Sequence, residues 1–342
     1  MKRRILKIIG VSILIYVFIC FATPFNLFLR NRSIENQINY LSRILDRGYD
    51  DDLQLSYPEG KLFSNALLAL STIEYCDRNN EFHERFSLIV DKCIHRIQSE
   101  KALRIFNPEI DPKYGMFYNG WVNYVNKAYQ GSPLFEYSSI QESVIGVSKV
   151  IEDRLLRTQI DSLRVLDTYL GSNWPADNLI GIMSLNEDSI KWRWIDTILN
   201  STNHPSKLVH HSGSNKSEIR GSSSAMITFC LSELTVDGIK EYDNTFKEIF
   251  VDEYLGIQLV KEYEDGSNIS DIDSGPVLFG YGASATIMNI KTQASLNSSR
   301  ARLTWAAMNV ISLPVNIFGK KYFMFKKEPM FDLFMLWGCV EL

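Results

Sequence analysis

Six times along the chain, a short polar turn containing glycine or proline leads into a segment of small, apolar and aromatic residues. Within these segments the apolar residues recur at helical spacing, and a more polar segment with a single apolar face lies between most of them. The pattern therefore predicts alternating inner and outer helices. The six turns begin at Tyr57, Tyr114, Asn173, Ile219, Asp271 and Glu328.

This alternation predicts an all-α fold and, more narrowly, an (α/α)6 toroid in which helical hairpins close into a ring. The inner helices of such a ring crowd around an axis, and the small residues of Ser222–Ala225 and Gly280–Ala285 suit that close packing. Strand signals are few: a short strand is expected over 257–263, and a strand or a short helix over 161–170. An irregular helical bundle is the alternative.

The first 32 residues carry the clearest local signal. Four basic residues lie ahead of the apolar run Ile8–Ala22, and residues 5–29 are enough to cross a bilayer, which needs about 20. We expect a transmembrane signal anchor over 1–32 and a toroid domain over 33–342. Because positive charge favours the cytoplasmic side, the N-terminus is expected in the cytoplasm and the main domain in the periplasm or outside the cell. A cleaved signal peptide and a buried core helix are the alternatives.

Composition narrows the classes of partner and cofactor. A formal net charge of -4 and a pI near 5.8 argue against nucleic-acid binding. The five cysteines do not have the spacing of a disulfide framework, although Cys76 and Cys93 could meet across a helical hairpin. The histidines lack metal-ligand spacing and the sequence has no phosphate-binding glycine motif, so neither a metal nor a cofactor is expected. Membrane contact is expected through residues 5–29, and protein partners stay unknown.

The fifth turn carries two carboxylates, Asp271 and Asp273, just before a helix expected over 276–291. Ser274 is a suitable N-cap, and Pro276 suits the first helical turn. Since one polar side chain is enough for capping, the two acids need another role. We predict Asp273 as a catalytic carboxylate and Asp271 as a substrate-binding one. The alternative is that both only complement the positive end of the helix.

The third and first turns add further acids. In the third turn, the segment NWPADN places an aromatic residue and an acid at the start of an apolar helix. Asp177 is predicted as the second catalytic carboxylate, and Trp174 as a stacking residue for a sugar ring or an apolar ligand. In the first turn, Glu59 is predicted to bind substrate. Both acids lie at helix starts, so stabilisation by the helix dipole is the alternative explanation.

Arg220, in the fourth turn, is a cation among these acids. Its guanidinium is suited to holding a substrate carboxylate through two hydrogen bonds, or to pairing with Asp273 or Glu59. The second turn is dense in aromatic and amide side chains. Of these, Tyr118 and Trp121 are predicted to bind substrate, with a place in the core as the alternative.

A long irregular segment, 201–217, separates the third and fourth turns. It is too long to be a simple turn, so we interpret it as a lid or a binding loop. Two adjacent histidines within this segment, His210 and His211, could reach the site, but exposure to solvent is the favoured expectation for both.

With these motifs the chain resembles the six-hairpin toroid enzymes, which include glycoside hydrolases, polysaccharide lyases, sugar epimerases and the linalool dehydratase–isomerase family. The resemblance extends through helix spacing over most of 40–342 and is sharpest at NWPADN, IRGSSSAM and DIDSGPVLFGYGASA. The last block, with FGKKYFMFKKEPMFDLFMLW, is similar to a group of membrane-anchored bacterial proteins of this kind. The resemblance implies a site in the axial funnel, with acids at inner-helix ends, where Asp177 and Asp273 fall.

One branch of these enzymes differs from the chain at the fourth turn. The unsaturated-uronyl hydrolases have an Asp ahead of a small-residue helix that resembles GSSSAMITFCLSEL. Here Glu218-Ile219-Arg220-Gly221 precedes that helix, so the acid of that branch is missing or displaced.

The sequence predicts a membrane-tethered extracytoplasmic enzyme that uses carboxylate acid–base chemistry on a carbohydrate, in the manner of a glycoside hydrolase. One carboxylic acid would protonate the leaving oxygen, while the other would activate water or act as the nucleophile. Two alternatives stay open: a dehydratase or isomerase acting on an isoprenoid alcohol, and a non-catalytic binding or scaffold module of an envelope complex. Several acids in the pocket favour a sugar, whereas one acid within walls of Phe117, Met226 and Phe279 favours the isoprenoid.

Overall fold

The computed structural model describes residues 2–186, 188–216, 218–271, 274–324 and 328–342. Within these ranges the chain is mostly helical with an apolar N-terminal helix, so the coarse prediction is confirmed. The α-helices are α1 (Lys2–Ala22), α2 (Leu27–Leu45), α3 (Tyr49–Ser56), α4 (Gly60–Asn79), α5 (Glu84–Ile97), α6 (Glu100–Leu103), α7 (Gly115–Gly131), α8 (Gln141–Asp161), α9 (Pro175–Met183), α10 (Asp188–Leu199), α11 (Gly221–Glu233), α12 (Ile239–Phe250), α13 (Ala283–Ser295), α14 (Ser299–Ile311) and α15 (Pro329–Cys339). The 3-10 helices are η1 (Thr23–Phe25) and η2 (Pro133–Tyr137). Three antiparallel hairpins pair β1 (Val251–Tyr254) with β2 (Ile257–Val260), β3 (Val277–Leu278) with β4 (Tyr281–Gly282), and β5 (Pro314–Ile317) with β6 (Lys320–Phe323).

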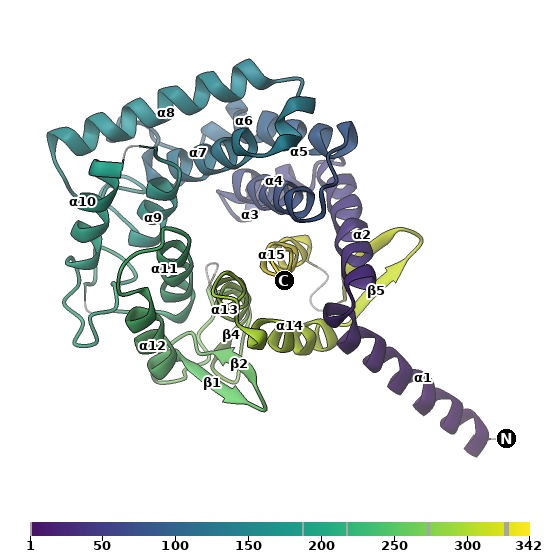
Figure 1. Cartoon of the computed structure of the whole chain (residues 1–342). Helices are drawn as coiled ribbons and strands as arrows, with labels where there is room; N and C mark the ends of the chain where they lie inside the picture. The colour runs from purple at the N-terminus through teal and green to yellow at the C-terminus, as the bar shows by residue number, and fades with distance from the viewer. Residues whose placement is uncertain (1, 187, 217, 272–273, 325–327) are drawn as a thin grey trace.

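Six helices contact one another in a closed cycle: α4 packs on α7, α7 on α9, α9 on α11, α11 on α13, α13 on α15, and α15 on α4. A second set lies outside them, with α5 on α4, α8 on α7, α10 on α9, α12 on α11, α14 on α13 and α2 on α15 (Figure 1). Every inner helix except α15 has as its outer partner a helix that follows it in the chain. Because α2 covers α15, helices from opposite ends of the chain pack together.

Inner and outer helices differ in burial, as their residue patterns predict. The inner helix α4 is buried on nearly every side, including polar Ser64, Asn65 and Ser71. The outer helix α5 buries its apolar face and exposes its polar face. Small residues permit close packing where α7 meets α9, since a Cβ on Gly120 would lie only 3.1 Å from the backbone nitrogen of Gly181.

The helix expected over 276–291 begins only at Ala283. Ahead of it, β3 and β4 form a tight hairpin whose turn residues, Phe279 and Gly280, both have positive φ. The apolar run that reads as the start of a helix is therefore this hairpin. Ser274 consequently caps no helix; its hydroxyl instead accepts a hydrogen bond from the backbone N–H of Asp271.

Two other local predictions, for residues 257–263 and 161–170, can be compared with the structure. The strand expected over 257–263 is confirmed as β2, and the β5–β6 hairpin lies between α14 and α15. Over 161–170 the chain is neither strand nor helix after α8 ends, apart from an isolated bridge from Tyr169 to Ser172. In α3, Asp50, Asp51 and Asp52 lie in the first turn, where their charges complement the helix dipole.

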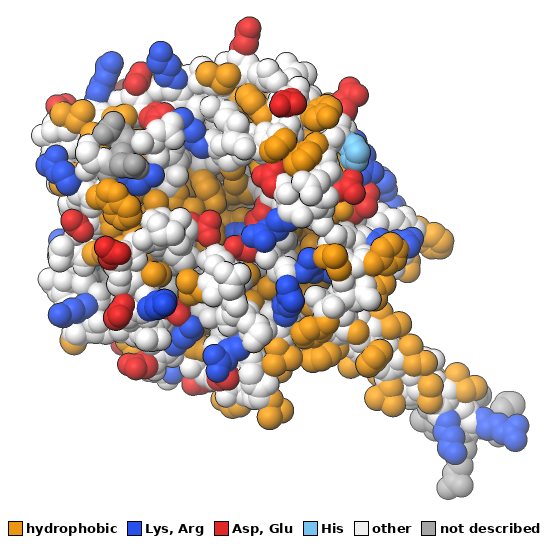
Figure 2. All heavy atoms as spheres, viewed as in Figure 1, with side chains coloured by type: hydrophobic (Ala, Val, Ile, Leu, Met, Phe, Trp, Pro, Cys, Tyr) orange, Lys and Arg blue, Asp and Glu red, His pale blue; other side chains and the backbone are white. Residues whose placement is uncertain are grey.

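Among the residues that the structure describes, α1 is the one helix long and apolar enough to cross a membrane, with a candidate span of Lys7–Phe25. Only 11% of that span is buried inside the body, so the alternative of a core helix is wrong. Figure 2 shows apolar side chains along α1, with basic side chains near its N-terminal end. This distribution is typical of a membrane anchor.

A buried lysine lies among late residues of the inner helices. The Nζ atom of Lys291, in α13, is 2.9 Å from a carboxylate oxygen of Glu74 in α4 and 3.2 Å from one of Glu341, which follows α15. Burial acts to lower the pKa of Lys291, but these two carboxylates outweigh it and raise the pKa above its ordinary value. The lysine therefore stays charged and complements the negative ends of the surrounding helices.

Substitution of two glycines tests this packing. Gly115, at the start of α7, has a φ of +75°, and a Cβ there would lie 2.0 Å from the carbonyl oxygen of Thr168. Gly115→Ala should therefore lower the free energy of unfolding by more than about 2 kcal/mol. Gly146, in the middle of α8, faces open space, and Gly146→Ala should raise it by about 0.5–1 kcal/mol. Chemical denaturation in detergent measures both changes, and equal effects would contradict the prediction.

Candidate functional site

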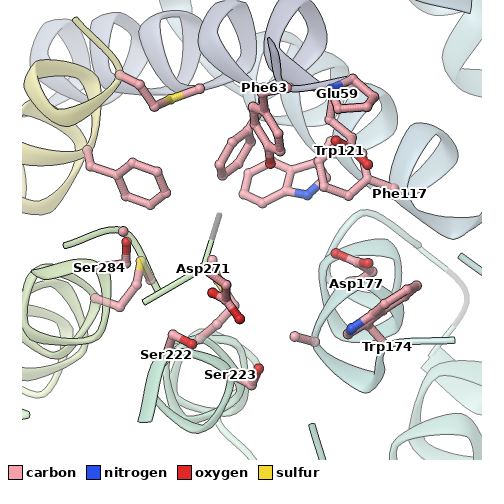
Figure 3. A pocket seen from close by; sticks show the side chains of 18 of the residues that line it. Glu59, Phe63, Phe117, Trp121, Trp174, Asp177, Ser222, Ser223, Asp271 and Ser284 are labelled. Carbon is pink, nitrogen blue, oxygen red and sulfur yellow. The ribbon is translucent and has the colours of Figure 1, made fainter. Parts of the chain in front are cut away.

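A cavity of about 850 Å³ lies where the first turns of the inner helices converge. Residues at or near the starts of α4, α7, α9, α11, α13 and α15 line it, so all six helices direct their N-terminal ends toward one space (Figure 3). First-turn N–H groups lack intrahelical partners and favour nearby negative charge. The acids that line the cavity are Glu59, Asp177, Asp271 and Glu328.

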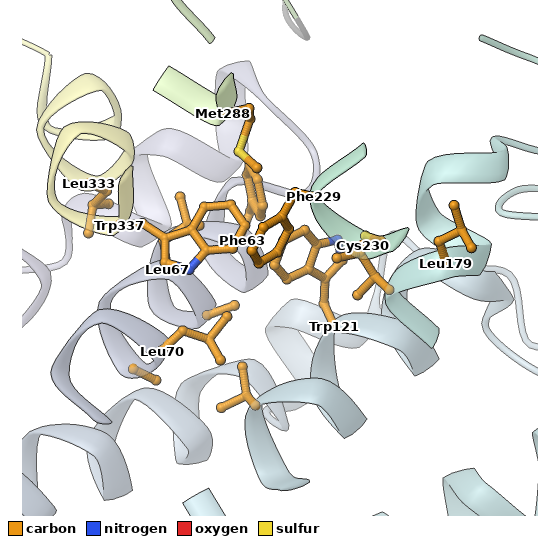
Figure 4. Packing of buried hydrophobic residues seen from close by; sticks show 14 of the residues in the cluster. Phe63, Leu67, Leu70, Trp121, Leu179, Phe229, Cys230, Met288, Leu333 and Trp337 are labelled. Carbon is orange, nitrogen blue, oxygen red and sulfur yellow. The ribbon is translucent and has the colours of Figure 1, made fainter. Parts of the chain in front are cut away.

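The floor of the cavity is a cluster of aromatic rings. Phe63 packs edge-on against Trp121 and Phe334, with ring centroids 4.9 Å and 5.4 Å apart. Trp121 and Phe229 both pack edge-on against Trp337, and these rings fill the centre of the helical cycle (Figure 4). The indole nitrogen of Trp121 is buried and has no hydrogen-bond partner within the described ranges. The floor therefore offers the faces and edges of its rings to the cavity, while this indole nitrogen is enclosed by the packing.

One wall is built around Glu59. This residue is the N-cap of α4, but its side chain makes no capping hydrogen bond and instead accepts one from the Tyr169 hydroxyl. Burial first, and then the Glu59 carboxylate, raise the pKa of Tyr169 well above its usual value. The phenol therefore stays protonated and holds Glu59 at the cavity. The Glu59 side chain is thus directed to Tyr169 at the cavity and does not cap α4 by a hydrogen bond.

Asp177 lies on the same wall, in the first turn of α9, which Pro175 opens. One of its carboxylate oxygens accepts a hydrogen bond from the Thr168 hydroxyl at 3.1 Å, and that hydroxyl oxygen also accepts the backbone N–H of Trp174. Thr168 thereby fixes both the acid and the start of its helix. The negative charge of Asp177 also contributes to the raised pKa of Tyr169, so Glu59, Tyr169 and Asp177 interact as one group.

Asp271 belongs to a different group of charges. One oxygen accepts the backbone N–H of Ser274 at 2.8 Å, and the other accepts a hydrogen bond from Arg220. Arg220 also donates to Glu218 at 2.9 Å. Burial acts to raise the pKa of Asp271, but the Ser274 N–H and Arg220 outweigh it and bring the pKa below its ordinary value. Asp271 is thus held ionised, and Arg220 is already occupied by two carboxylates.

The expectation that His210 and His211 face solvent is wrong. Both are buried, because the irregular segment folds back and the backbone N–H of His211 donates to the carbonyl of Glu218 at 2.8 Å. His211 lines the cavity, with its Nδ1 atom 2.5 Å from the hydroxyl of Ser223. Burial, and then the charge of Arg220, lower the pKa of His211 to about 4. At neutral pH the imidazole is therefore uncharged and suited to hydrogen bonding.

Glu262 lies one hydrogen bond behind the cavity wall. It is fully buried, and one carboxyl oxygen accepts the hydroxyl of the cavity residue Ser222 at 2.7 Å. The other oxygen has no hydrogen-bond partner in the part of the chain that the structure describes. Burial, opposed in part by Ser222, raises the pKa of Glu262 to about 7. A carboxyl that exchanges a proton near neutral pH therefore lies next to the cavity.

The structure brings most of the predicted site residues together. Those that line the cavity are Glu59, Trp121, Trp174, Asp177 and Asp271, while Arg220 contacts Asp271. Tyr118 is buried and packs against Phe106 and Tyr114 rather than on the cavity wall, which fits its core alternative. Asp273 lies outside the described residues. Phe279 is exposed at the tip of the β3–β4 hairpin and does not wall the cavity.

Sequence reasoning missed several cavity residues. Tyr169 and Thr168 follow an ambiguous segment and carry no motif, so their contacts with Glu59 and Asp177 depend on tertiary structure alone. Ser222 and Ser223 were expected to serve only close helix packing, yet they line the cavity. Their position in the first turn of an inner helix was the available signal.

The comparisons with known proteins give no family. No family model matches the chain, and no curated protein matches it. Within the described ranges, no group of three or more His, Cys, Asp and Glu side chains is arranged to hold a metal ion. The function is therefore argued from the cavity itself.

The raised pKa of Glu262 predicts a pH dependence of stability. Folding raises this pKa from 4.5 to about 7, so the folded state binds more protons between these values. The free energy of unfolding should consequently fall as pH rises through that window. Glu262 should contribute on the order of 3 kcal/mol to this fall. In Glu262→Gln this contribution should be absent when the free energy of unfolding, measured by chemical denaturation, is compared at pH 4.5 and pH 8.

A matched control is Glu136→Gln, which changes an exposed carboxyl. Asp332 and Glu341 also have pKa values raised to about 7. The free energy of unfolding of Glu262→Gln should therefore still fall as pH rises, but by less than that of the unaltered protein. A pH dependence identical in Glu262→Gln and the unaltered protein would contradict the assignment.

Proposed function

We propose that the chain is an (α/α)6 toroid and a carbohydrate-active enzyme that uses carboxylate acid–base chemistry. The closed cycle of six helices, each covered by an outer helix, supports the architecture. The observation that carries the activity is the convergence of acids from separate turns on one cavity with an aromatic floor. Ligand cavities commonly combine apolar walls with a few converging polar groups.

Asp177 keeps its predicted catalytic role in this proposal. Its partner is Glu59, because both acids contact the Thr168–Tyr169 segment on one wall of the cavity. One carboxylic acid protonates the leaving oxygen, and the other carboxylate activates water or attacks the sugar carbon. Asp273 remains the partner predicted from the sequence and is tested beside Glu59. Asp271 binds substrate, since Arg220 and Ser274 keep it ionised.

The composition of the cavity supports a sugar over an isoprenoid alcohol. Among the described residues, four acids line it, as expected for a sugar. Of the three apolar walls expected for the isoprenoid, Phe117 and Met226 also line it, whereas Phe279 is exposed instead. Trp174, which lines the cavity, offers a ring for stacking on a sugar. Because Arg220 already pairs with Glu218 and Asp271, it is not free to hold a substrate carboxylate. We therefore propose a neutral or positively charged sugar rather than a uronic acid.

The proposal includes attachment to a membrane. The exposed apolar span Lys7–Phe25 supports anchoring through α1. The basic residues ahead of it support a cytoplasmic N-terminus and an extracytoplasmic body.

Substitutions at the carboxylates test this function. Asp177→Asn and Glu59→Gln should each lower kcat/KM by at least about 100-fold, because each removes a proton-transfer group or a nucleophile. The measurement is release of reducing ends from a panel of neutral and amino-sugar glycans by the detergent-solubilised protein. Tyr118→Phe is the matched control and should leave the rate unchanged, since Tyr118 does not line the cavity.

The same panel separates the competing assignments. Full loss in Asp273→Asn with an active Glu59→Gln would replace Glu59 by Asp273 in the catalytic pair. Full activity in a folded Asp177→Asn would overturn the mechanism. Glycan binding without turnover would favour the non-catalytic binding module, and turnover of an isoprenoid alcohol alone would favour the dehydratase or isomerase.

A further inference from the structure

The anchor helix does not leave the body at its end. The hydroxyl of Tyr16, midway along the candidate span, donates to the carbonyl of Pro314 at 2.8 Å. Asn309 in α14 donates to the carbonyl of Cys20 at 2.7 Å, and Cys20 is buried. The second half of α1 is therefore docked on α14 and the start of β5.

This docking limits how far the body can stand from a membrane. From Ile8 to Tyr16, α1 rises about 12 Å, whereas the hydrocarbon core of a bilayer is about 30 Å thick. The apolar part of α1 that is clear of the body is thus too short to cross the membrane alone. If α1 spans the bilayer, the body surface beside Tyr16 and Cys20 lies within the depth of the leaflet on the same side as the body.

The surface beside the docked half of α1 is rich in exposed apolar side chains. It comprises the end of α14 and the tip of the β5–β6 hairpin, where Ile311, Leu313, Ile317 and Phe318 are exposed. Asn316 and Lys320 are exposed at the same tip, and a long lysine side chain can reach the polar headgroups from there. In Figure 1 this hairpin lies next to the junction of α1 and α2, and in Figure 2 apolar side chains continue from α1 onto the adjoining body. Exposed apolar groups that gather in this way mark an interaction surface.

Phe318 is the most prominent member of this surface, with 95% of its area exposed. It occupies a hairpin turn with positive φ, followed by Gly319, where Asn or Gly would be less strained. Leu255–Gly256 and Phe279–Gly280 form similar turns, so the strain alone does not single out Phe318. Its location beside the anchor does.

We propose that the β5–β6 tip and the end of α14 insert into the bilayer beside α1, so that the body is partly immersed and held in one orientation. The partner is the lipid of the leaflet next to the body, which α1 and the docked hairpin reach side by side. This inference rests on the proposed anchoring by α1. It adds a second membrane contact to the predicted one through residues 5–29.

Fluorophore labelling of the full chain in liposomes tests the inference. The five native cysteines are buried, so a thiol-reactive, polarity-sensitive dye should label an introduced exposed cysteine. The labelled variants are Phe318→Cys at the hairpin tip, Ile13→Cys within the candidate span, and Val150→Cys on α8 as the matched control. All three positions are exposed, and Figure 1 places α8 on the side of the body away from α1.

We expect a blue-shifted emission, quenched by nitroxide-labelled lipid, at positions 318 and 13, and neither effect at position 150. Quenching at 13 without quenching at 318 would overturn the second contact and leave the anchor intact. No quenching at 13 would overturn the anchoring itself, and the hairpin inference with it. Quenching at 150 as strong as at 318 would show general adsorption and would also overturn the inference.

Discussion

The structure depends on one constraint: the six inner helices direct their N-terminal ends to the same space. A helix leaves several N–H groups unpaired at its start and several carbonyl groups unpaired at its end, so six such helices gather partial positive charge at one end and negative charge at the other. The charged residues are distributed so that each end of the helices has side chains of opposite charge nearby. Acids line the cavity at the N-terminal ends, whereas Lys291 lies among late residues of the same helices.

This polarity also explains why capping and function are difficult to separate in the sequence. An acid in a first turn stabilises its helix whether or not it acts on a ligand. The side-chain partners show what holds two of the cavity acids in place. Glu59 makes no capping hydrogen bond and is held by Tyr169, and Asp271 belongs to an ion-pair network with Arg220. In both cases the partner comes from a distant segment: Tyr169 was not predicted at all, and Arg220 was expected to pair with Asp273 or Glu59 rather than with Asp271.

The inner helices were predictable because small and apolar residues recur at helical spacing. The predictions that failed concern mostly the segments between these helices. The run after Asp271 looks like the start of a helix, but a two-residue turn with positive φ at Phe279–Gly280 converts it into a hairpin. Likewise, no local pattern indicates that the segment around His211 folds inward, because its burial comes from contacts with Glu218 and Ser223. Periodicity reports the face that an element buries; it does not report which loop covers the cavity.

The sixth turn shows how one acid can serve the fold alone. Asp332, in α15, is buried, and its carboxylate accepts the backbone N–H of Phe323 in β6 at 3.0 Å. Its own carbonyl accepts the amide of Gln37 in α2 at 2.7 Å. One residue thus joins the last inner helix to the helix that continues from the anchor and to the hairpin beside that anchor. Phe323 pairs with Pro314, whose carbonyl accepts the hydroxyl of Tyr16 in α1, so closure of the helical cycle and docking of α1 are linked through β5 and β6. A change that loosens α15 should therefore also loosen the hold of the body on its anchor.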